Sequence, residues 1–429
     1  MQRMRAVAGM AIAICLLLAG AAQAATFTVN TKGDNGDADT ADGICDTSAA
    51  LGGLQCSLRA AIEQANVASD SDFIMFDIPG TGVQRIKPGS ALPTISQPVT
   101  INGYSQPGAS ANTSTNATTN AVILIDLDGS NSFGVQAALQ ISGGNTTVRG
   151  LAINNFDALG AANGVGIRLL NQPGNVIRGN FIGTNPAGTA AQPNNGSGVT
   201  MEGSSTGNSI GGTTAAAPNL VSGNFNGITV SSGSNSVARN LVGTDKTGTA
   251  DLGNNRVGIV ISGDGNTLLH NTVAFNFHNG VDVFSGTGNL IGSNSIFNND
   301  DLGIDVGNDG PTPNDAGDAD TGANNLQNSP TFFAAQTNGS GDTTVSVHMD
   351  SAPNQDYTIR IFRNPIGTVQ GKTFVGSMTV HTGASGLGDS GTVALTRTVP
   401  AGETLTATAT DASNNTSEFS LGKLVRAVP

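Results

Sequence analysis

The sequence predicts an all-β protein: a right-handed parallel β-helix with an N-terminal helical cap and a C-terminal immunoglobulin-like β-sandwich. A short strand that begins with Gly recurs through the middle of the chain, and a second unit with Asn at both ends follows most copies. Longer alternating strands begin only after about residue 330. We expect a signal peptide at 1–24, a cap at 25–73, the β-helix at 74–310, an acidic linker at 311–330 and the sandwich at 331–429.

The first residues have the features of a secretory signal peptide. Arg3 and Arg5 give a positive start, and the apolar run at 11–18 is too short to span a bilayer. Ala22-Gln23-Ala24 is a small-x-small cleavage site. We therefore expect an exported protein, extracellular, at the cell surface or in the periplasm, with no membrane span in the mature chain.

Cleavage of this peptide would remove Cys15 and leave Cys45 and Cys56 in an oxidising compartment. A single cysteine pair in such a compartment predicts a disulfide. Metal ligation is the alternative, but it would require two further ligands, and no His lies nearby.

The two repeated units predict the turns of the β-helix. Strands of three or four residues cannot bury a core alone, so each must stack on its equivalent in the next turn, ~4.8 Å away. Aliphatic side chains then point inward, while Gly and Asn form the corners and Asn side chains bond along the axis. An alternating sandwich would not explain the regularly spaced Asn. The strands begin at Gly164, Gly198, Gly227, Gly258, Gly280 and Gly303, and the Asn pairs are Asn175–Asn180, Asn235–Asn240, Asn266–Asn271 and Asn289–Asn294.

One helix is predicted, over residues 57–66, directly before the strand at 73–76. An open β-helix end exposes unpaired backbone, so this helix fits a cap over the first turn. The run Cys56-Ser57-Leu58-Arg59-Ala60, with Cys45 and the strand at 27–30, resembles the CSLREA domain of exported bacterial β-helix proteins.

The resemblance covers most of the chain, because it includes the loops that begin at Gly183 and Gly243 and residues 303–328. Ala60 departs from the family pattern, which has Glu there, and should loosen the cap by removing the capping-box partner of Ser57. The resemblance implies a right-handed β-helix at the surface or outside the cell, and it implies no particular activity.

Beyond residue 330 the strands are longer and alternate between apolar and polar residues, at 344–348, 357–362, 374–378 and 404–410. This spacing is typical of an immunoglobulin-like sandwich. We expect the sandwich to close the far end of the β-helix.

Composition limits the partners. A net charge of −13 with 18 basic residues disfavours nucleic acid and anionic membranes. Trp is absent and the only tyrosines are Tyr104 and Tyr357. This scarcity of aromatic platforms weakens the interpretation as a sugar-binding cleft.

Polysaccharide lyases, polygalacturonases and epimerases use this scaffold, but the chain has no Gly-His-Gly motif, and its Arg85-Ile86-Lys87 comes too early for a polygalacturonase. A lyase needs a cation for the substrate carboxylate and a base for the α-proton. Arg239 and His270 fit best, because each directly precedes a unit-closing Asn on consecutive turns. An outward-facing pair without a catalytic role is the alternative, since a shared fold does not supply function.

Asp282 and Asp305 occupy the same place in strands that are one turn apart. We expect both to face outward and to stack. Carboxylates this close repel unless a proton or a cation lies between them, and calcium suits oxygen ligands best. Solvated repulsion, a calcium site and a catalytic pair remain open. Arg168 and Glu202 should likewise stack as an outward ion pair.

Two further acidic groups are spaced like calcium-binding loops. Neither completes the EF-hand pattern, so a solvated acidic loop is the alternative for both. The groups are Asp315, Asp318 and Asp320, and Asp34, Asp37, Asp39 and Asp42.

Three function classes remain. The first is an exported scaffold or adhesin-like protein that binds an extracellular polysaccharide or another surface. The scarcity of catalytic groups favours this class. The second is a polysaccharide lyase, hydrolase or epimerase. The third is a purely structural repeat protein.

Overall fold

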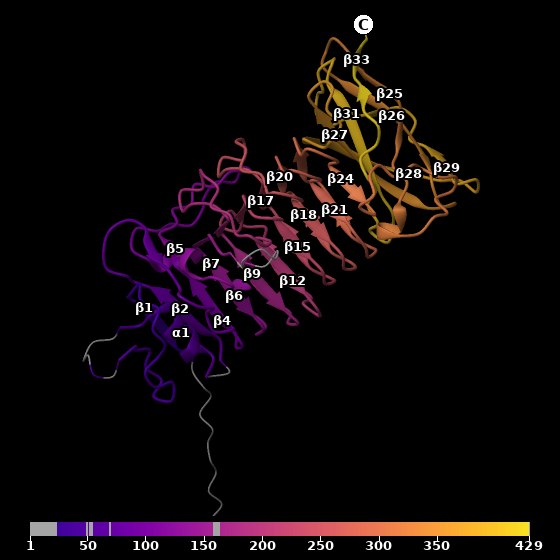
Figure 1. The fold of residues 1–429 in the computed structure, drawn as a ribbon. Coiled ribbons are helices and arrows are strands. Elements are labelled where there is room, and N and C mark those ends of the chain that lie inside the picture. The colour runs from indigo at the N-terminus through magenta and orange to yellow at the C-terminus, as the bar shows by residue number, and fades with distance from the viewer. Residues whose placement is uncertain (1–23, 49, 51–54, 68–69, 158–163, 429) are drawn as a thin grey trace, which may run out of the picture.

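The structure is a computed structural model that describes residues 24–48, 50, 55–67, 70–157 and 164–428. It is an elongated molecule with three long parallel sheets, followed by two antiparallel sheets at the C-terminal end (Figure 1). The predicted fold class, a parallel β-helix with a C-terminal β-sandwich, is confirmed. The predicted signal peptide, apart from residue 24, lies outside the described residues.

Each turn of the β-helix contributes strands to three parallel sheets, here named A, B and C. Sheet A contains β1 (Thr26–Val29), β2 (Asp72–Phe76), β4 (Val99–Asn102), β7 (Thr147–Arg149), β10 (Val176–Arg178), β13 (Ser209–Gly211), β16 (Ser236–Ala238), β19 (Thr267–Leu269) and β22 (Leu290–Ile291). Sheet B contains β3 (Gln84–Ile86), β5 (Ile125–Asp128), β8 (Leu151–Asn154), β11 (Phe181–Ile182), β14 (Leu220–Val221), β17 (Leu241–Val242), β20 (Thr272–Ala274) and β23 (Ser295–Phe297). Sheet C contains β6 (Ala137–Ile141), β9 (Val165–Leu170), β12 (Val199–Glu202), β15 (Ile228–Val230), β18 (Ile259–Ile261), β21 (Val281–Val283) and β24 (Ile304–Val306).

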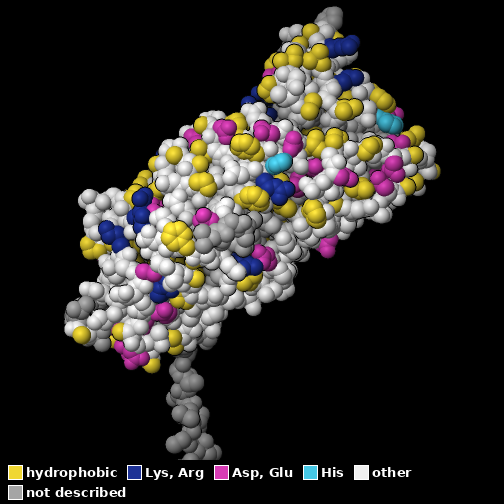
Figure 2. Space-filling view, in the orientation of Figure 1, with side chains coloured by type: hydrophobic (Ala, Val, Ile, Leu, Met, Phe, Trp, Pro, Cys, Tyr) yellow, Lys and Arg dark blue, Asp and Glu magenta, His cyan; other side chains and the backbone are white. Residues whose placement is uncertain are grey.

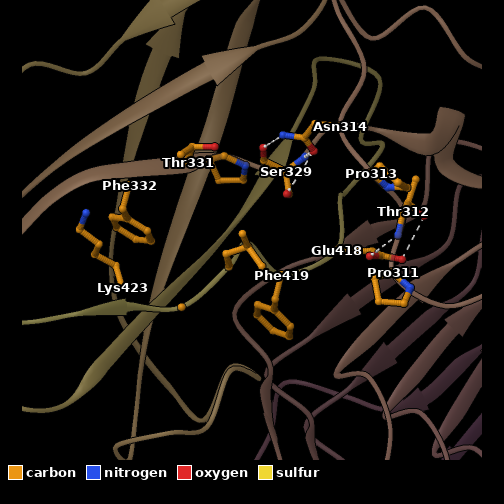
Figure 3. A pocket seen from close by; sticks show the side chains of 13 residues that line it. Pro311, Thr312, Pro313, Asn314, Ser329, Thr331, Phe332, Glu418, Phe419 and Lys423 are labelled. Carbon is orange, nitrogen blue, oxygen red and sulfur yellow. Dashed lines mark hydrogen bonds between the residues drawn. The ribbon is translucent and has the colours of Figure 1, made fainter.

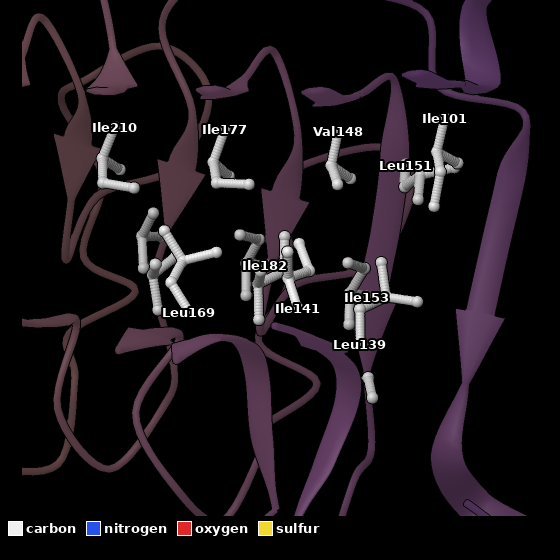
Figure 4. Packing of buried hydrophobic residues seen from close by; sticks show 14 of the residues in the cluster. Ile101, Leu139, Ile141, Val148, Leu151, Ile153, Leu169, Ile177, Ile182 and Ile210 are labelled. Atoms are coloured by element: carbon white, nitrogen blue, oxygen red, sulfur yellow. The ribbon is translucent and has the colours of Figure 1, made fainter. Parts of the chain in front are cut away.

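Aliphatic side chains from equivalent positions form continuous columns inside the β-helix. In sheet A, Ile101, Val148, Ile177 and Ile210 are paired in register on successive strands and are fully buried (Figure 4). Each such side chain contributes roughly 1.5–3 kcal/mol by leaving water. The columns explain how strands of three residues build one core.

Asn side chains form ladders along the axis, as the sequence predicts. In each ladder an Asn side-chain oxygen accepts a hydrogen bond from the Asn of the preceding turn, at 2.8–3.3 Å. Two ladders contain the predicted pairs: Asn175, Asn208, Asn235, Asn266 and Asn289, and Asn180, Asn219, Asn240, Asn271 and Asn294.

A third ladder was not predicted. It consists of Asn residues that stand three or four positions before the Gly of a sheet C strand, and this spacing could have revealed it. Its members are Asn194, Asn224, Asn254, Asn276 and Asn299.

The helix α1 (Leu58–Ala65) packs against β1 and β2, as expected for a cap. The Ser57 hydroxyl accepts a hydrogen bond from the backbone N–H of Ala60 (3.0 Å), so the predicted N-cap is present. The β-helix begins earlier than the predicted residue 74, because β1 supplies the first strand of sheet A and pairs with β2.

The predicted disulfide joins Cys45 to Cys56 and is confirmed. It closes a loop beside α1, where Asn30 Oδ1 accepts a hydrogen bond from the Cys56 N–H (2.9 Å).

Replacing both cysteines with Ser should lower the free energy of unfolding by about 3 kcal/mol, because the open loop gains conformational entropy in the unfolded chain. Urea denaturation of the two proteins measures the difference. A double variant as stable as the parent would show that the disulfide does not limit cap stability.

The sandwich consists of two antiparallel sheets around the buried Tyr357. One contains β25 (Thr331–Thr337), β26 (Thr343–Asp350), β29 (Leu387–Asp389), β30 (Val393–Ala394) and the short parallel partner β33 (Arg426–Ala427). The other contains β27 (Asp356–Asn364), β28 (Thr373–His381), β31 (Thr404–Thr410) and β32 (Lys423–Leu424).

Polar side chains continue the Asn ladders beyond the last turn and so close the β-helix. Asn324, in the 3-10 helix η3 (Ala323–Leu326), accepts from the Asn289 N–H (3.0 Å). Gln370 of the sandwich accepts from the Asn299 N–H (3.1 Å). The predicted linker at 311–330 thus helps to cap the β-helix as well as connecting the domains. No described helix is long and apolar enough to cross a membrane.

Candidate functional site

The outer face of sheet B is largely covered. The chain between β4 and β5 passes over it, and Ala121 and Ile123 pack against outward side chains such as Phe181 and Leu220. This covering chain, residues 103–124, begins with the 3-10 helix η1 (Gly103–Ser105). Its cover stops before the last two strands of the sheet, β20 and β23.

A polar groove of about 240 Å³ opens where this cover ends. The covering chain forms one side of it, and the loop at 212–217 is tied to that chain by a hydrogen bond from Asn112 Nδ2 to the Ala215 carbonyl (2.7 Å). The groove is lined mainly by hydroxyl-bearing and amide side chains, together with one Arg and one His. These residues are Ser114, Thr115, Asn116, Thr118, Thr214, Arg239, His270, Thr272, Ser293 and Ser295.

Arg239 and His270 lie on neighbouring turns, as the sequence predicts. The Arg239 N–H donates to the Leu269 carbonyl (3.1 Å), and both side chains are exposed at the groove. Arg239 forms no ion pair with any described residue, whereas Arg59 and Arg168 have acidic partners. On the face shown in Figure 2, basic side chains are few and most lie beside acidic ones. The groove therefore offers an uncompensated positive charge.

The backbone at both positions is unfavourable for a side chain. Arg239 has φ of 59° and His270 has φ of 58°, in the left-handed region. The same corner is occupied in earlier turns by Gly150 and Gly179, with φ of 76° and 65°. A side chain there costs roughly 1–2 kcal/mol, and backbone strain of this kind clusters at functional sites. The strain favours a functional role for the pair.

The chemistry of the groove is that of binding more than of acid–base catalysis. Its described lining contains no Asp, Glu or Lys. His270 is thus the one lining side chain suited to act as a general base, and no carboxylate in the lining orients it. The Arg and the hydroxyl groups can bind the carboxylates and hydroxyls of a sugar polymer.

Asp282 and Asp305 stack in register, as predicted, but of the three alternatives left open, the solvated pair is wrong. Each is only 4% exposed. Asn279 Nδ2 donates to both carboxylates, at 2.7 and 2.9 Å, and Asn279 Oδ1 accepts from the Leu302 N–H. That last bond fixes the amide so that its NH₂ group, not its oxygen, lies between the carboxylates. This arrangement disfavours calcium between them.

The pKa of Asp282 is raised to about 6, chiefly by burial; the Asn279 hydrogen bond lowers the pKa and the neighbouring Asp305 raises it. Burial also raises the pKa of Asp305. Ionisation of the pair near neutral pH therefore lowers the stability of the folded protein. None of the five cavities found among the described residues is lined by Asp282, so the structure offers the pair no substrate cleft.

Glu418 extends this acidic column into the sandwich. Its carboxylate accepts from the N–H groups of Val306 and Thr312, both at 3.0 Å. The same residue borders a cavity of about 550 Å³ between the linker and the sandwich, which is also lined by Phe332 and Phe419 (Figure 3). Burial raises the Glu418 pKa, and Asp305 adds to the effect. These contacts make Glu418 part of the interdomain junction.

The structure brings Asp315, Asp318 and Asp320 together, with potential ligand oxygens within 4.8 Å of one another. Asp318 is held by the Asn328 N–H (2.9 Å) and Gln327 Nε2 (2.7 Å). Buried Oδ1 atoms of Asp315 and Asp320 have no hydrogen-bond partner. Unsatisfied carboxylate oxygens in one cluster fit a hard cation such as calcium.

The four acidic residues near the N-terminus are used differently. Asp34 pairs with Arg59 (2.9 Å), Asp37 accepts from the Asp46 N–H (2.9 Å), and Asp39 and Asp42 accept backbone N–H bonds in local turns. The structure therefore does not bring Asp34, Asp37, Asp39 and Asp42 into one metal-binding group among the described residues.

The predicted ion pair is present: Arg168 Nη2 lies 2.6 Å from Glu202 Oε2. It is diagonal, because Arg168 is opposite Thr200 in the register, and Glu202 is opposite Leu170.

The fold and the groove define a β-helix protein with an exposed polar groove that contains one unpaired Arg. No protein-family model matches the chain, and a search of curated proteins finds no match.

Proposed function

We propose that the protein is an exported β-helix scaffold that binds an acidic polysaccharide outside the cell, through the polar groove around Arg239 and His270. The observation that carries the proposal is the unpaired Arg239 among hydroxyl groups, in a protein whose net charge is −13. An uncompensated cation at a hydroxyl-lined surface favours a ligand that carries both carboxylates and hydroxyls.

Several features support export. The disulfide is typical of an oxidising compartment. The N-terminal sequence has signal-peptide features, and the capped cysteine-bearing start of the β-helix is the part that resembles the CSLREA domain.

Calorimetric titration with a polyuronate tests the proposal, with a carboxyl-reduced form of the same polymer as the ligand control. Arg239→Gln should weaken binding about tenfold or more, because a charge-assisted hydrogen bond is worth about 1.5–3 kcal/mol. Arg397→Gln removes a charge that is also exposed, in the sandwich, and should leave affinity unchanged. Equal binding of the reduced polymer, or equal loss in both variants, would contradict the proposal.

Arg239→Gly separates function from stability. It should weaken polyuronate binding, yet raise the free energy of unfolding by about 0.5–1 kcal/mol, because Gly relieves the left-handed strain at a smaller entropic cost. Denaturation and titration of the same preparation check both effects. If the variant is less stable than the parent, the strain argument for this corner fails.

A lyase is the second candidate, because Arg239 and His270 lie beside each other in the groove. Cleavage would release unsaturated products that absorb near 235 nm. Their appearance with the parent protein, and their loss in His270→Gln, would replace the binding proposal with a catalytic one.

Calcium at Asp315, Asp318 and Asp320 is also proposed, on the strength of the two unsatisfied Oδ1 atoms. Added calcium should raise the melting temperature of the parent protein, and Asp320→Asn should remove most of this rise, since binding to the folded state alone stabilises it. Asp300→Asn, at an exposed carboxylate, is the matched control. The same calcium response in Asp320→Asn would place the ion elsewhere.

A further inference from the structure

A second group of unpaired polar side chains lies on sheet A, on the other side of the 212–217 loop from the polar groove. Arg149 and Arg178 are in register on neighbouring strands, β7 and β10, and each points outward because Val148 and Ile177 fill the interior. Neither forms an ion pair with a described residue. Two Arg side chains that extend outward from strands one spacing apart (~4.8 Å) repel each other unless an anion lies between them.

Two buried atoms in this group have no hydrogen-bond partner. They are Nε of Arg149 and Oδ1 of Asn102, and their residues are paired in register on β7 and β4. Asn102 is only 7% exposed. Nε–H can only donate and Oδ1 can only accept, so Arg149 keeps an unused donor and Asn102 an unused acceptor.

Tyr104 provides an aromatic surface beside them. Its ring lies against Gly150 and Gly179, where an added Cβ would come within 3 Å of its atoms, and its hydroxyl donates to the Gly179 carbonyl (2.6 Å). Glycine at these two corners therefore makes room for the ring. The ring is half-buried, so part of it remains available for contact.

We infer that Asn102, Tyr104, Arg149 and Arg178 form a subsite for a uronic acid residue, whose carboxylate binds the two Arg. The inference rests on the proposed function and deepens it. The Gly179 N–H donates to the Ala217 carbonyl (3.1 Å), so the 212–217 loop lies between this subsite and the polar groove. A polymer that contacts both sites runs along the β-helix axis.

Tyrosine fluorescence reports this subsite directly, because the protein has no Trp and Tyr357 is fully buried in the sandwich. A polyuronate should change the fluorescence of the parent protein with the same midpoint as calorimetric binding. Tyr104→Phe should remove the signal. Arg178→Gln should weaken long-polymer binding several-fold and flatten its salt dependence, as fewer counterions are displaced, while melting curves verify that it is folded.

The outcomes separate this inference from the proposed function. Binding that Arg239→Gln weakens, but that neither changes tyrosine fluorescence nor responds to Arg178→Gln, overturns the subsite and leaves the groove. Binding that Arg178→Gln weakens and Arg239→Gln does not supports the subsite and overturns the groove. Failure of the parent protein to bind any polyuronate overturns both.

Discussion

Replacing Asn254 with Ala should lower the free energy of unfolding by about 3 kcal/mol or more, because several buried hydrogen bonds are lost at once. Asn254 is fully buried in the third ladder. Its side-chain oxygen accepts from the Asn224 N–H (3.0 Å), and its Nδ2 donates to Asn276 Oδ1 (2.8 Å) and to the Val221 carbonyl (3.2 Å). The substitution leaves the Asn224 N–H and the Val221 carbonyl without these partners in the interior.

The adjacent residue provides the control. Asn255 is exposed, so Asn255→Ala removes the same chemical group outside the ladder and should change stability by less than about 0.5 kcal/mol. Guanidinium denaturation of the two variants measures the contrast. Similar values for both would show that the ladders follow the backbone without stabilising it.

The architecture could be predicted because each turn of the β-helix repeats the same short strand and the same corner residues. The Gly-initiated strands fall at equivalent positions in successive turns, and all six predicted strands pair consecutively along sheet C. The third Asn ladder was not predicted, although each of its members stands three or four residues before the Gly of a sheet C strand. Local spacing to the next strand was the informative signal.

The polar groove could be predicted only in part. The alignment of Arg239 with His270 follows from their position before the second ladder. The wall formed by Ser114 and Thr118 does not, because the chain at 103–124 has no repeat and folds over sheet B through tertiary contacts. The proposed subsite at Tyr104 could not be predicted for the same reason, although Tyr104 is one of only two tyrosines in the sequence.

The acidic pair shows the limit of register alone. Alternation places Asp282 and Asp305 away from the aliphatic interior, and sequence reasoning equates that side of a strand with solvent. In the structure both carboxylates are buried instead, and Asn279 and the chain after β24 lie against them. Their environment depends on residues that no periodicity connects to them.

Substituting Asp282 with Asn should raise the free energy of unfolding near pH 7.5 by about 1–3 kcal/mol, since one pKa unit corresponds to about 1.4 kcal/mol. The folded-state pKa of Asp282 is raised to about 6, above the value of ~3.9 expected in the unfolded chain. The folded protein therefore binds this proton more tightly than the unfolded protein does. Its contribution to stability is fully present below about pH 4 and is lost as the pH rises through about 6.

Denaturation of the parent and of Asp282→Asn from pH 4 to 8 measures this difference. We expect the stability of the parent to fall more steeply than that of the variant between pH 4 and 6, and the two curves to run parallel above about pH 7 with the variant higher. Asp305, Asp318 and Glu418 also have raised pKa values and affect both proteins, so only the difference between the curves reports Asp282. Asp300→Asn, which removes an exposed carboxylate, should follow the parent. A variant less stable than the parent at pH 7.5 would mean that the ionised Asp282 stabilises the fold, and the Asn279 amide would then have to compensate the charge fully.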